Sequence, residues 1–251
     1  MRFGEMHAPT LRELDRDAVV VLAPIAACEQ HGPHLPTLTD TILVTGVAEA
    51  VERLLPESVL LLPTLWLGAS HHHLPLGATL SLSADTHVSV LCELLQTMLD
   101  EGFTRVLLLN GHGGNIDPMH VALRLLQPNY RDRLLSAACY WDLADSDLRE
   151  LCEGPYRGIG HACEIETSLM LALRPELVRM DLRQDDVRTL PPEMQGLYVA
   201  EDLEQTTHDG VIGCPSYASA EKGQRMLDAT ARRIAATIRT ILQIPLPLRR
   251  E

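Results

Sequence analysis

Short apolar runs alternate with longer amphipathic segments along this chain of 251 residues. Four runs are almost continuously apolar, which is typical of parallel strands covered on both faces; they are Asp17–Ala26, Val59–Leu65, Arg105–Leu109 and Leu134–Tyr140. Five segments carry apolar residues at helical spacing: Thr41–Leu55, Asp85–Glu101, Asn115–Leu126, His161–Leu173 and Ala218–Leu242. This alternation predicts an α/β fold with a mainly parallel sheet.

The chain contains no repeat, long charge run or Ser/Gly-rich linker, so the sequence predicts a single domain over residues 1–251. Three loops punctuated by Gly and Pro are too long to be simple connections: Gly154–Gly160, Thr189–Gly196 and Thr206–Tyr217. Long ordered loops in a compact domain usually shape active sites or subunit contacts. We therefore expect these segments near a functional site or an interface.

Charge and cysteine content narrow the class of protein. The 21 Lys and Arg residues against 34 Asp and Glu residues give a formal net charge of −13, and no basic stripe interrupts it. Such a surface repels phosphate backbones and anionic lipids, which argues against nucleic-acid and membrane partners. The six cysteines form no CxxC pair, as expected for reduced thiols. The sequence shows no signal-like or membrane-spanning apolar run, so we expect a cytoplasmic protein.

The residues suited to chemistry lie in turns directly after the apolar runs. Glu29 and His31 follow the first run, Asp40 comes nine residues after His31, and His112 lies in NGHGGN after the third run. Carboxylates and imidazoles are the ligands of Zn²⁺, Mn²⁺ and Fe²⁺. Ligands bind α/β proteins outside the carboxyl ends of the strands. The pattern therefore predicts a metal-dependent enzyme.

Some of these residues also have a structural interpretation. Asp40 precedes a predicted helix, where an N-cap carboxylate is ordinary. The segment Asn110–Asn115 has the glycines of a phosphate-binding turn, although it lacks the Lys and Ser/Thr of a P-loop. Cys28 and Cys163 flank the motif residues, so a thiolate ligand is a further alternative.

Two more segments carry candidate histidines. His161 and Glu166 lie in GHACEIETS at the start of a predicted helix. A first-turn carboxylate is favoured by the helix dipole, but a histidine and an acid at a helix mouth also suit acid–base catalysis or metal ligation. In the run His71–His73, three adjacent side chains cannot all face one ion. We expect one or two of them to reach the site and the rest to be solvated.

Taken together, these segments resemble the creatininase (creatinine amidohydrolase) superfamily. The resemblance covers most of the chain and is carried by five ordered segments: EQHGPHLPTLTD, SHHHLPLGATLSLS, GFTRVLLLNGHGGN, HACEIETSLML and VIGCPSYASAEKG. It implies a Rossmann-like three-layer α/β sandwich, in agreement with the strand pattern. It also implies assembly as a homo-hexamer.

The resemblance implies roles for individual residues. The expected metal ligands come from two of these segments: Glu29, His31, Asp40 and His112. Asp40 is expected to bridge two divalent ions per chain, Zn²⁺ or alternatively Mn²⁺ or Fe²⁺. Glu166 is the candidate for completing the second metal shell and for a catalytic role, and His161 matches the histidine that handles protons. Ser70 and His73 are candidate substrate contacts.

This chain departs from the creatininase pattern at two neighbouring positions. Creatininase has a glutamate two residues after the last ligand histidine, where this chain has Gly114, and a tyrosine where it has Gly113. Only two tryptophans, Trp66 and Trp141, are present, and the loop before His161 contains none. An aromatic enclosure for creatinine is therefore not evident, and we expect a different substrate.

The expected reaction is hydrolysis of a C–N bond in a small amide, cyclic amide or formamide by a metal-activated hydroxide. His161 would deliver a proton to the departing nitrogen. The alternative keeps the metals but cleaves a short precursor peptide, as the mycofactocin-system peptidase does among relatives with NGHGGN. Two other classes are a non-catalytic metal-binding scaffold, which only Gly114 favours, and a nucleotide-binding module, which lacks a phosphate-anchoring lysine.

Overall fold

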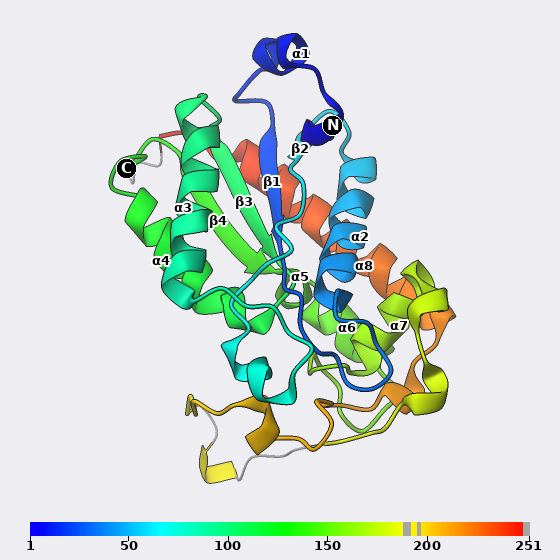
Figure 1. Ribbon diagram of the computed structural model, residues 1–251. Helices are drawn as coiled ribbons and strands as arrows, with labels where there is room; N and C mark the ends of the chain where they lie inside the picture. The colour runs from blue at the N-terminus through cyan, green and yellow to red at the C-terminus, as the bar shows by residue number, and fades with distance from the viewer. Residues whose placement is uncertain (188–191, 195–196, 248–251) are drawn as a thin grey trace.

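The computed structural model describes residues 1–187, 192–194 and 197–247. Within these residues, parallel strands form one sheet in the order β2-β1-β3-β4 (Figure 1). Their bounds are β1 (Val20–Ile25), β2 (Val59–Leu61), β3 (Arg105–Asn110) and β4 (Leu134–Cys139). The two central strands, β1 and β3, are buried along their whole length, because helices cover both faces of the sheet.

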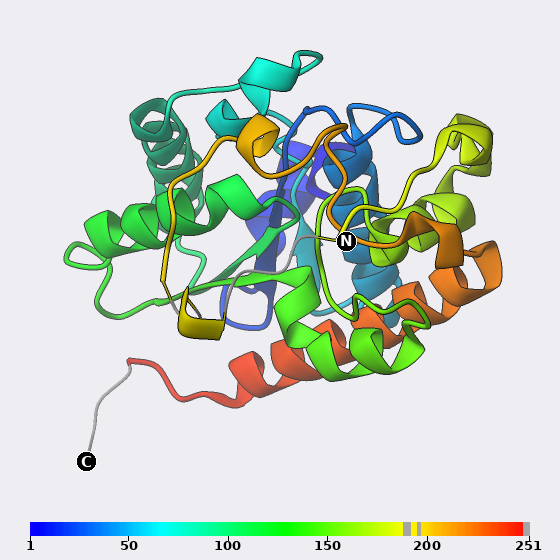
Figure 2. The same ribbon diagram turned by 90° about the horizontal axis from the view of Figure 1, so that it is seen from below.

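The helices form a layer on each side of the sheet (Figures 1 and 2). Helices α3 and α4 pack together on one face, and α8 packs against α2, α7, α5 and α6 on the other. The helix bounds are α1 (Ala8–Glu13), α2 (Thr39–Leu54), α3 (Ala84–Asp100), α4 (Ile116–Leu126), α5 (Tyr140–Leu143), α6 (Asp145–Leu151), α7 (Glu164–Leu173) and α8 (Ala220–Gln243). Short 3-10 turns connect them: η1 (Phe3–Glu5), η2 (His71–Leu76), η3 (Gly113–Asn115), η4 (Pro175–Leu177), η5 (Met180–Leu182), η6 (Pro192–Met194), η7 (Leu203–Gln205) and η8 (Pro215–Tyr217).

The predicted three-layer α/β fold with a parallel sheet is confirmed, although most elements begin or end one to three residues away from the predicted positions; α7, for example, begins at Glu164 and not at His161. Strand β2 stops at Leu61 instead of reaching Leu65, because Pro63 has no N–H to donate to the neighbouring strand. Helix α3 begins one residue earlier than predicted, and the Ser83 side chain caps it by accepting a hydrogen bond of 3.2 Å from Thr86 N. Of the predicted loop Thr189–Gly196, positions 189–191 and 195–196 lie outside the described residues.

The buried apolar side chains of the described residues form one contiguous cluster that runs between the layers. A single domain over residues 1–251 stays a prediction. No helix in the described part of the chain has the length and apolar character needed to cross a membrane.

The parallel register pairs Ile25 at the end of β1 with Asn110 at the end of β3. The segments that follow these strands therefore leave the sheet at the same edge, and this positions the candidate site.

Candidate metal centre

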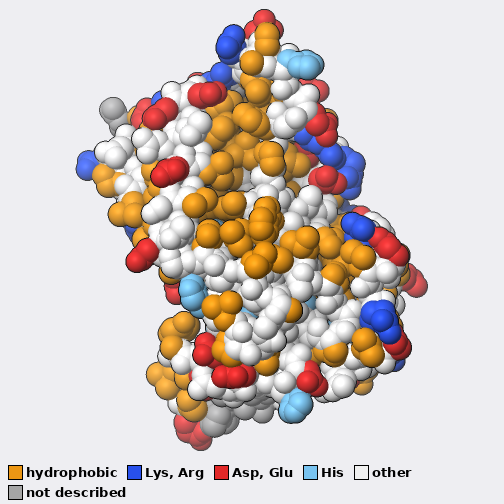
Figure 3. All heavy atoms as spheres, viewed as in Figure 1, with side chains coloured by type: hydrophobic (Ala, Val, Ile, Leu, Met, Phe, Trp, Pro, Cys, Tyr) orange, Lys and Arg blue, Asp and Glu red, His pale blue; other side chains and the backbone are white. Residues whose placement is uncertain are grey.

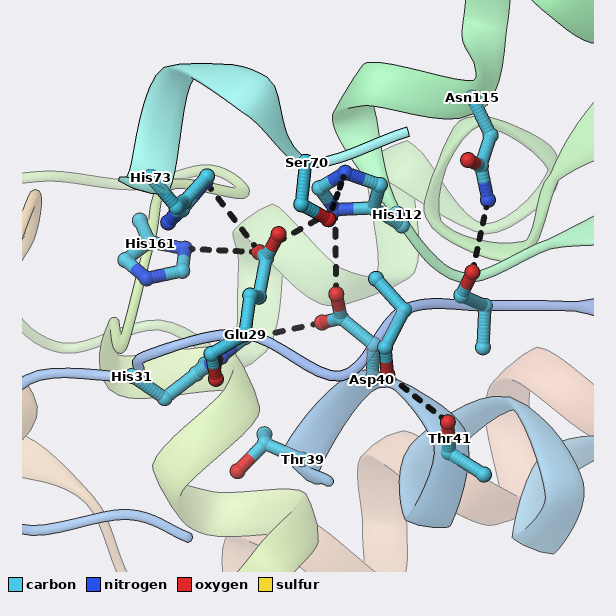
Figure 4. A network of polar contacts seen from close by, with 12 residues as sticks. Glu29, His31, Thr39, Asp40, Thr41, Ser70, His73, His112, Asn115 and His161 are labelled. Carbon is cyan, nitrogen blue, oxygen red and sulfur yellow. Dashed lines mark hydrogen bonds and ion pairs between the residues drawn. The ribbon is translucent and has the colours of Figure 1, made fainter. Parts of the chain in front are cut away.

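The site forms where β1 and β3 end side by side. The segment after β1 carries Glu29 and His31, and the turn after β3 carries His112. Figure 4 shows the Glu29, Asp40, His112 and His161 side chains turned toward one another. Parallel pairing of the two strands, more than closeness in sequence, thus brings these candidate residues together.

Two helix beginnings supply the remaining carboxylates. Asp40 lies in the first turn of α2, but the N-cap of that helix is Leu38, and no side chain caps it. The N-cap interpretation of Asp40 is therefore wrong, and its carboxylate is turned into the site (Figure 4). Thr41 Oγ1 donates to Ala27 O at 2.9 Å, which holds this turn against the segment leaving β1. Glu166 lies in the first turn of α7.

The NGHGGN turn is held by its own asparagines. The Asn110 side chain accepts a hydrogen bond from His112 N at 3.0 Å and donates one to His112 O at 2.6 Å. The Asn115 side chain donates to Ala26 O and accepts from Ala69 N, both at 3.0 Å. The N–H groups of His112 and Asn115 are engaged within the turn, so they do not form a phosphate cradle.

Five buried donors form two groups that share Asp40. In the first group, His112 Nδ1 lies 3.1 Å from Glu29 Oε1 and 3.1 Å from Asp40 Oδ2. In the second, His31 Nε2 lies 3.2 Å from Asp40 Oδ1 and 3.7 Å from Glu166 Oε1. The donor atoms within each group lie within 4.8 Å of one another. Each Asp40 oxygen thus belongs to a different group, which is the geometry expected of a carboxylate between two cations.

A third group of donors joins Glu29, His31 and His161. His161 Nδ1 lies 3.8 Å from Glu29 Oε1, whereas its Nε2 lies 2.8 Å from Gln30 O. A carbonyl oxygen accepts only, so Nε2 carries the proton and the Nδ1 lone pair faces the site. The Gln30 amide nitrogen lies 3.0 Å from His73 Nδ1. The sequence-based reasoning missed Gln30, although it stands between two candidate ligands.

The donor set fits a cation, because several of its buried polar atoms lack a hydrogen-bond partner among the described residues. Glu29 Oε2, His31 Nε2 and Asp40 Oδ2 are fully buried and make no hydrogen bond of acceptable geometry to any residue that the structure describes. Buried polar atoms without partners are costly unless another species satisfies them. Carboxylate and imidazole donors that converge in this way fit Zn²⁺ or Mn²⁺.

The close approach of buried carboxylates and imidazoles shifts their pKa values. Burial by itself lowers the pKa of His112, but the Glu29 and Asp40 carboxylates outweigh it and raise that pKa to about 10. Burial raises the pKa of Glu29. A protonated imidazole therefore balances the carboxylates in the metal-free protein, and a bound cation would replace that proton. Burial lowers the pKa values of His161 and His73, so both are neutral.

The predicted substrate contacts fall in different places. Ser70 is fully buried, and its Oγ lies 3.2 Å from His112 Nε2, so it supports that ring from behind. It is not among the described residues that line the cavity, in contrast to the prediction of a substrate contact. His73 and His72 line the cavity, whereas His71 is exposed. One or two histidines of this run reach the site, as predicted.

Gly114 stands where creatininase has a glutamate, and the backbone explains why a side chain is excluded here. A Cβ atom at Gly114 would lie 2.1 Å from Ala69 O and 2.5 Å from His112 Nε2. Both are closer than real Cβ contacts, and one of them is to backbone. The turn therefore packs directly onto the neighbouring segment, and a carboxylate cannot be restored at this position without moving it.

The Glu166 carboxylate makes one contact at the helix start and one toward the candidate ligands. Its Oε2 accepts a hydrogen bond of 3.2 Å from Cys163 N, as a carboxylate does at a helix start. Its Oε1 points the other way and lies 3.7 Å from His31 Nε2. Neither Cys28 nor Cys163 belongs to any of the donor groups among the described residues, so a thiolate ligand finds no support.

A cavity of about 370 Å³ opens above these donors. Ile159 and Ile212 line it, and they come from two of the long loops expected near a functional site. Trp141 lines it as well, which the sequence-based reasoning missed because this residue lies just after β4 and far from the motifs. The walls are thus largely apolar, with the polar groups gathered at the floor.

A buried ion pair beside the site was also missed. Lys222 Nζ lies 2.6 Å from Glu164 Oε1, 3.0 Å from Glu153 Oε2 and 2.7 Å from Tyr217 O. The Glu164 carboxylate also accepts hydrogen bonds from Glu153 N and Gly154 N, both at 2.9 Å. These contacts join α7, α8 and the loop that leads to the site histidine. The sequence offered one signal of this ion pair, because Lys222 is its only lysine.

A Rossmann-like sandwich that gathers carboxylates and imidazoles at the carboxyl edge of its sheet defines an α/β enzyme with a candidate metal centre. The chain belongs to the creatininase family, described as creatinine amidohydrolase, whose pattern matches residues 4–238. The prediction of a creatininase-family hydrolase acting on C–N bonds is thereby confirmed at the level of the family.

Characterised relatives differ in what they act on. The chain is 30% identical over 243 residues to the mycofactocin precursor peptide peptidase of Mycobacterium ulcerans, covering 92% of this chain and 91% of the relative. It is 30% identical over 237 residues to the creatinine amidohydrolase of Pseudomonas putida, covering 88% of each. It is 26% identical over 262 residues to the 3-dehydro-scyllo-inosose hydrolase of Thermotoga maritima, covering 96% of this chain and 83% of the relative.

Solved creatininase structures share the whole fold. A manganese creatininase superimposes with a TM-score of 0.80 and a mutant creatininase of Zn–Zn type with 0.79. Both are 28% identical to this chain and cover 95% of it, with 97% of their own length matched. Creatininases thus occur with either metal on this scaffold.

Proposed function

We propose that this protein is a metal-dependent amidohydrolase that cleaves a C–N bond in a small amide, cyclic amide or formamide. The observation that carries the proposal is the Asp40 carboxylate, which has one oxygen in each of two donor groups. Glu29, Asp40 and His112 would hold one divalent ion, and His31, Asp40 and Glu166 the other. The similarity to a creatinine amidohydrolase and to manganese and zinc creatininases supports both the amide chemistry and the metals.

Ions in such a site lower the pKa of bound water toward neutrality and polarise a substrate carbonyl. The chain contributes by orienting its donors beforehand. His112 Nε2 lies 3.1 Å from Ala69 O, so it donates there and leaves Nδ1 facing Glu29 and Asp40, where a bound cation would replace the Nδ1 proton. A ligand histidine held through its other nitrogen keeps one tautomer and one ring orientation.

Proton transfer falls to His161. Its Nε2–H is held by Gln30 O, and its Nδ1 lone pair faces the floor of the cavity. Nδ1 accepts a proton from the attacking water as the new C–O bond forms, and it returns that proton to the nitrogen as the C–N bond breaks. Burial lowers the pKa of His161, so the imidazole starts neutral with its Nδ1 lone pair unprotonated.

The substrate is expected to differ from creatinine. Trp141 is the one tryptophan among the described lining residues, and the lining includes no Lys or Arg. A flat ring enclosed by several aromatic side chains, or a substrate carboxylate paired with a cation, finds no match in such a wall. Cleavage of a precursor peptide is the second candidate, favoured by the mycobacterial relatives and by the open side of the cavity.

Glu166→Gln is expected to weaken the binding of one ion selectively. The amide keeps an oxygen for Cys163 N, so the helix start survives, but the charge facing His31 is lost. Loss of a ligand charge should cost at least the roughly 10–100-fold in metal affinity that an outer-shell partner contributes. Zn²⁺ titration by calorimetry should resolve one weakened site and one unchanged site. An unchanged titration would reduce Glu166 to a helix-start carboxylate.

His161→Ala is expected to keep both ions and to lower turnover by about 10²–10⁴-fold, the usual contribution of a general acid–base. The assay is ammonia release from a panel of primary amides and formamide, with metal content measured in parallel. Added imidazole should restore part of the rate, because it can occupy the space left by the ring. A fall in metal content would make His161 a ligand, and a normal kcat would remove it from the mechanism.

Assembly and location stay predictions. A homo-hexamer is supported by large apolar side chains that remain exposed, Trp66, Leu74 and Leu80 among them. Apolar side chains also gather over the middle of the face shown in Figure 3. Apolar patches of this kind often mark protein–protein contacts. A cytoplasmic location is proposed from the composition.

A further inference from the structure

A second hollow adjoins the cavity above the metal centre. Its volume is about 740 Å³, and it shares His72, Gly113 and Ile116 with that cavity. Its walls come from η2, the beginning of α4 and residues 198–205. η2 and η7 contact each other, and Figure 2 shows them close together on the side of the molecule where the site lies.

Gly113 stands at the junction of the two spaces. A Cβ atom added there would have no neighbour within 4 Å, in contrast to Gly114 beside it, where backbone already fills the space. Gly113 is exposed and does not have a positive φ that would require glycine. The absence of a side chain at this residue therefore leaves the passage open, and no demand of the backbone explains it.

The second hollow also has a definite lining. Asp117 and Asp202 carry negative charge into it, and no Lys or Arg is among its described lining residues. Tyr198 and Val199 add exposed apolar surface, with Tyr198 88% exposed. A wall of this kind repels anions and suits a chain of methylene groups that ends in a cation.

We infer that the substrate is an elongated amide, with its scissile bond over the metal centre and a tail that passes Gly113 into the second hollow. The tail is apolar along its length and ends in an ammonium group. This inference rests on the proposed function, because it takes the metal centre as the place of bond cleavage. A peptide with a free amino end and an amine-bearing small molecule share this chemistry.

The probes are three hydroxamic acids, which chelate a metal through the same group and differ in the tail: acetohydroxamic acid, 6-aminohexanohydroxamic acid and the monohydroxamic acid of adipic acid. Their Kd values are measured by calorimetry on the Zn²⁺-loaded protein. We expect the amino-tailed probe to bind about tenfold tighter or better than the acetyl probe, because its methylene groups are buried. The carboxylate-tailed probe should gain less than the amino-tailed one.

Two variants at the junction form a matched pair. Gly113→Tyr should block the passage and bring the ratio of the acetyl to the amino-tailed Kd toward one. Gly113→Ala adds a single carbon where nothing is in contact, and it should keep the wild-type ratio. The ratio is internal to each variant, so a general change at the metal centre cancels.

The outcomes separate the inference from the proposed function. If acetohydroxamic acid fails to bind the Zn²⁺-loaded protein, or binds the metal-free protein equally well, the proposed metal centre is wrong. If it binds only the loaded protein but the tails add nothing, the elongated substrate is wrong and the proposed function stands. If the amino and carboxylate tails improve the Kd equally, only the proposed ammonium end of the substrate is wrong. If the amino tail still improves the Kd in Gly113→Tyr, the tail does not pass Gly113 into the second hollow.

Discussion

Asp40→Ala is expected to remove both divalent ions and to reduce amide hydrolysis to background. The two Asp40 oxygens lie 3.1 Å from His112 Nδ1 and 3.2 Å from His31 Nε2, so one carboxylate serves both donor groups. Its loss leaves each group with one carboxylate and one imidazole. Metal ions at such sites contribute several kcal/mol to the transition state, so activity should fall by about 10³-fold or more.

Metal content by elemental analysis, after loading with Zn²⁺ and dialysis, tests this expectation directly. Asp85→Ala is the matched control, because Asp85 also lies in the first turn of a helix but is exposed and outside the donor groups. The control should keep the wild-type metal content. Two ions retained by Asp40→Ala would contradict the shared carboxylate, and one retained ion would show that Asp40 binds a single ion.

Lys222→Met is expected to lower the free energy of unfolding by about 3–5 kcal/mol, the usual cost of stranding one member of a buried ion pair. Lys222 is 7% exposed and Glu164 is 1% exposed. Without the ammonium group, the Glu164 carboxylate stays buried with only two backbone N–H donors. Burial lowers the pKa of Lys222, but Glu164 and Glu153 outweigh it and raise that pKa, so the side chain is charged at neutral pH.

Urea unfolding measures this effect, and the chain offers a matched control. Glu153 contacts the same ammonium group, but its side chain is 71% exposed, so Glu153→Gln should cost only about 0–1 kcal/mol. Adding Glu164→Gln to Lys222→Met should recover part of the loss, because it removes the stranded charge. Equal effects of Lys222→Met and Glu153→Gln would show that the buried pair does not hold α7 and α8 together.

The relatives indicate that this scaffold carries more than one activity, since they are a precursor peptide peptidase, a creatinine amidohydrolase and an inosose hydrolase. In this chain the donors lie at the floor of the cavity, whereas Trp141, Ile159 and Ile212 form its walls. Floor and walls come from different segments. Substrate choice can therefore change through the loops while the donors stay in place.

Much of the fold was predictable from the sequence alone, for local physical reasons. A strand buried on both faces must be apolar at almost every position, so β1 and β3 were evident as continuous runs. Parallel strands place their carboxyl ends at one edge, so polar residues after each run were expected to meet there. Glu29, His31 and His112 could be named as candidates on that basis, and the ordered motifs indicated the family.

Only the tertiary structure decided which of these candidates touch. The contact of Glu166 with His31 depends on where α7 begins against the segment after β1, and no sequence pattern specifies that placement. Ser70 lies behind His112 because the segment after β2 passes beneath the NGHGGN turn. These contacts join residues far apart in sequence, and they depend on packing between layers, whereas apolar periodicity reports only which side of one element is buried.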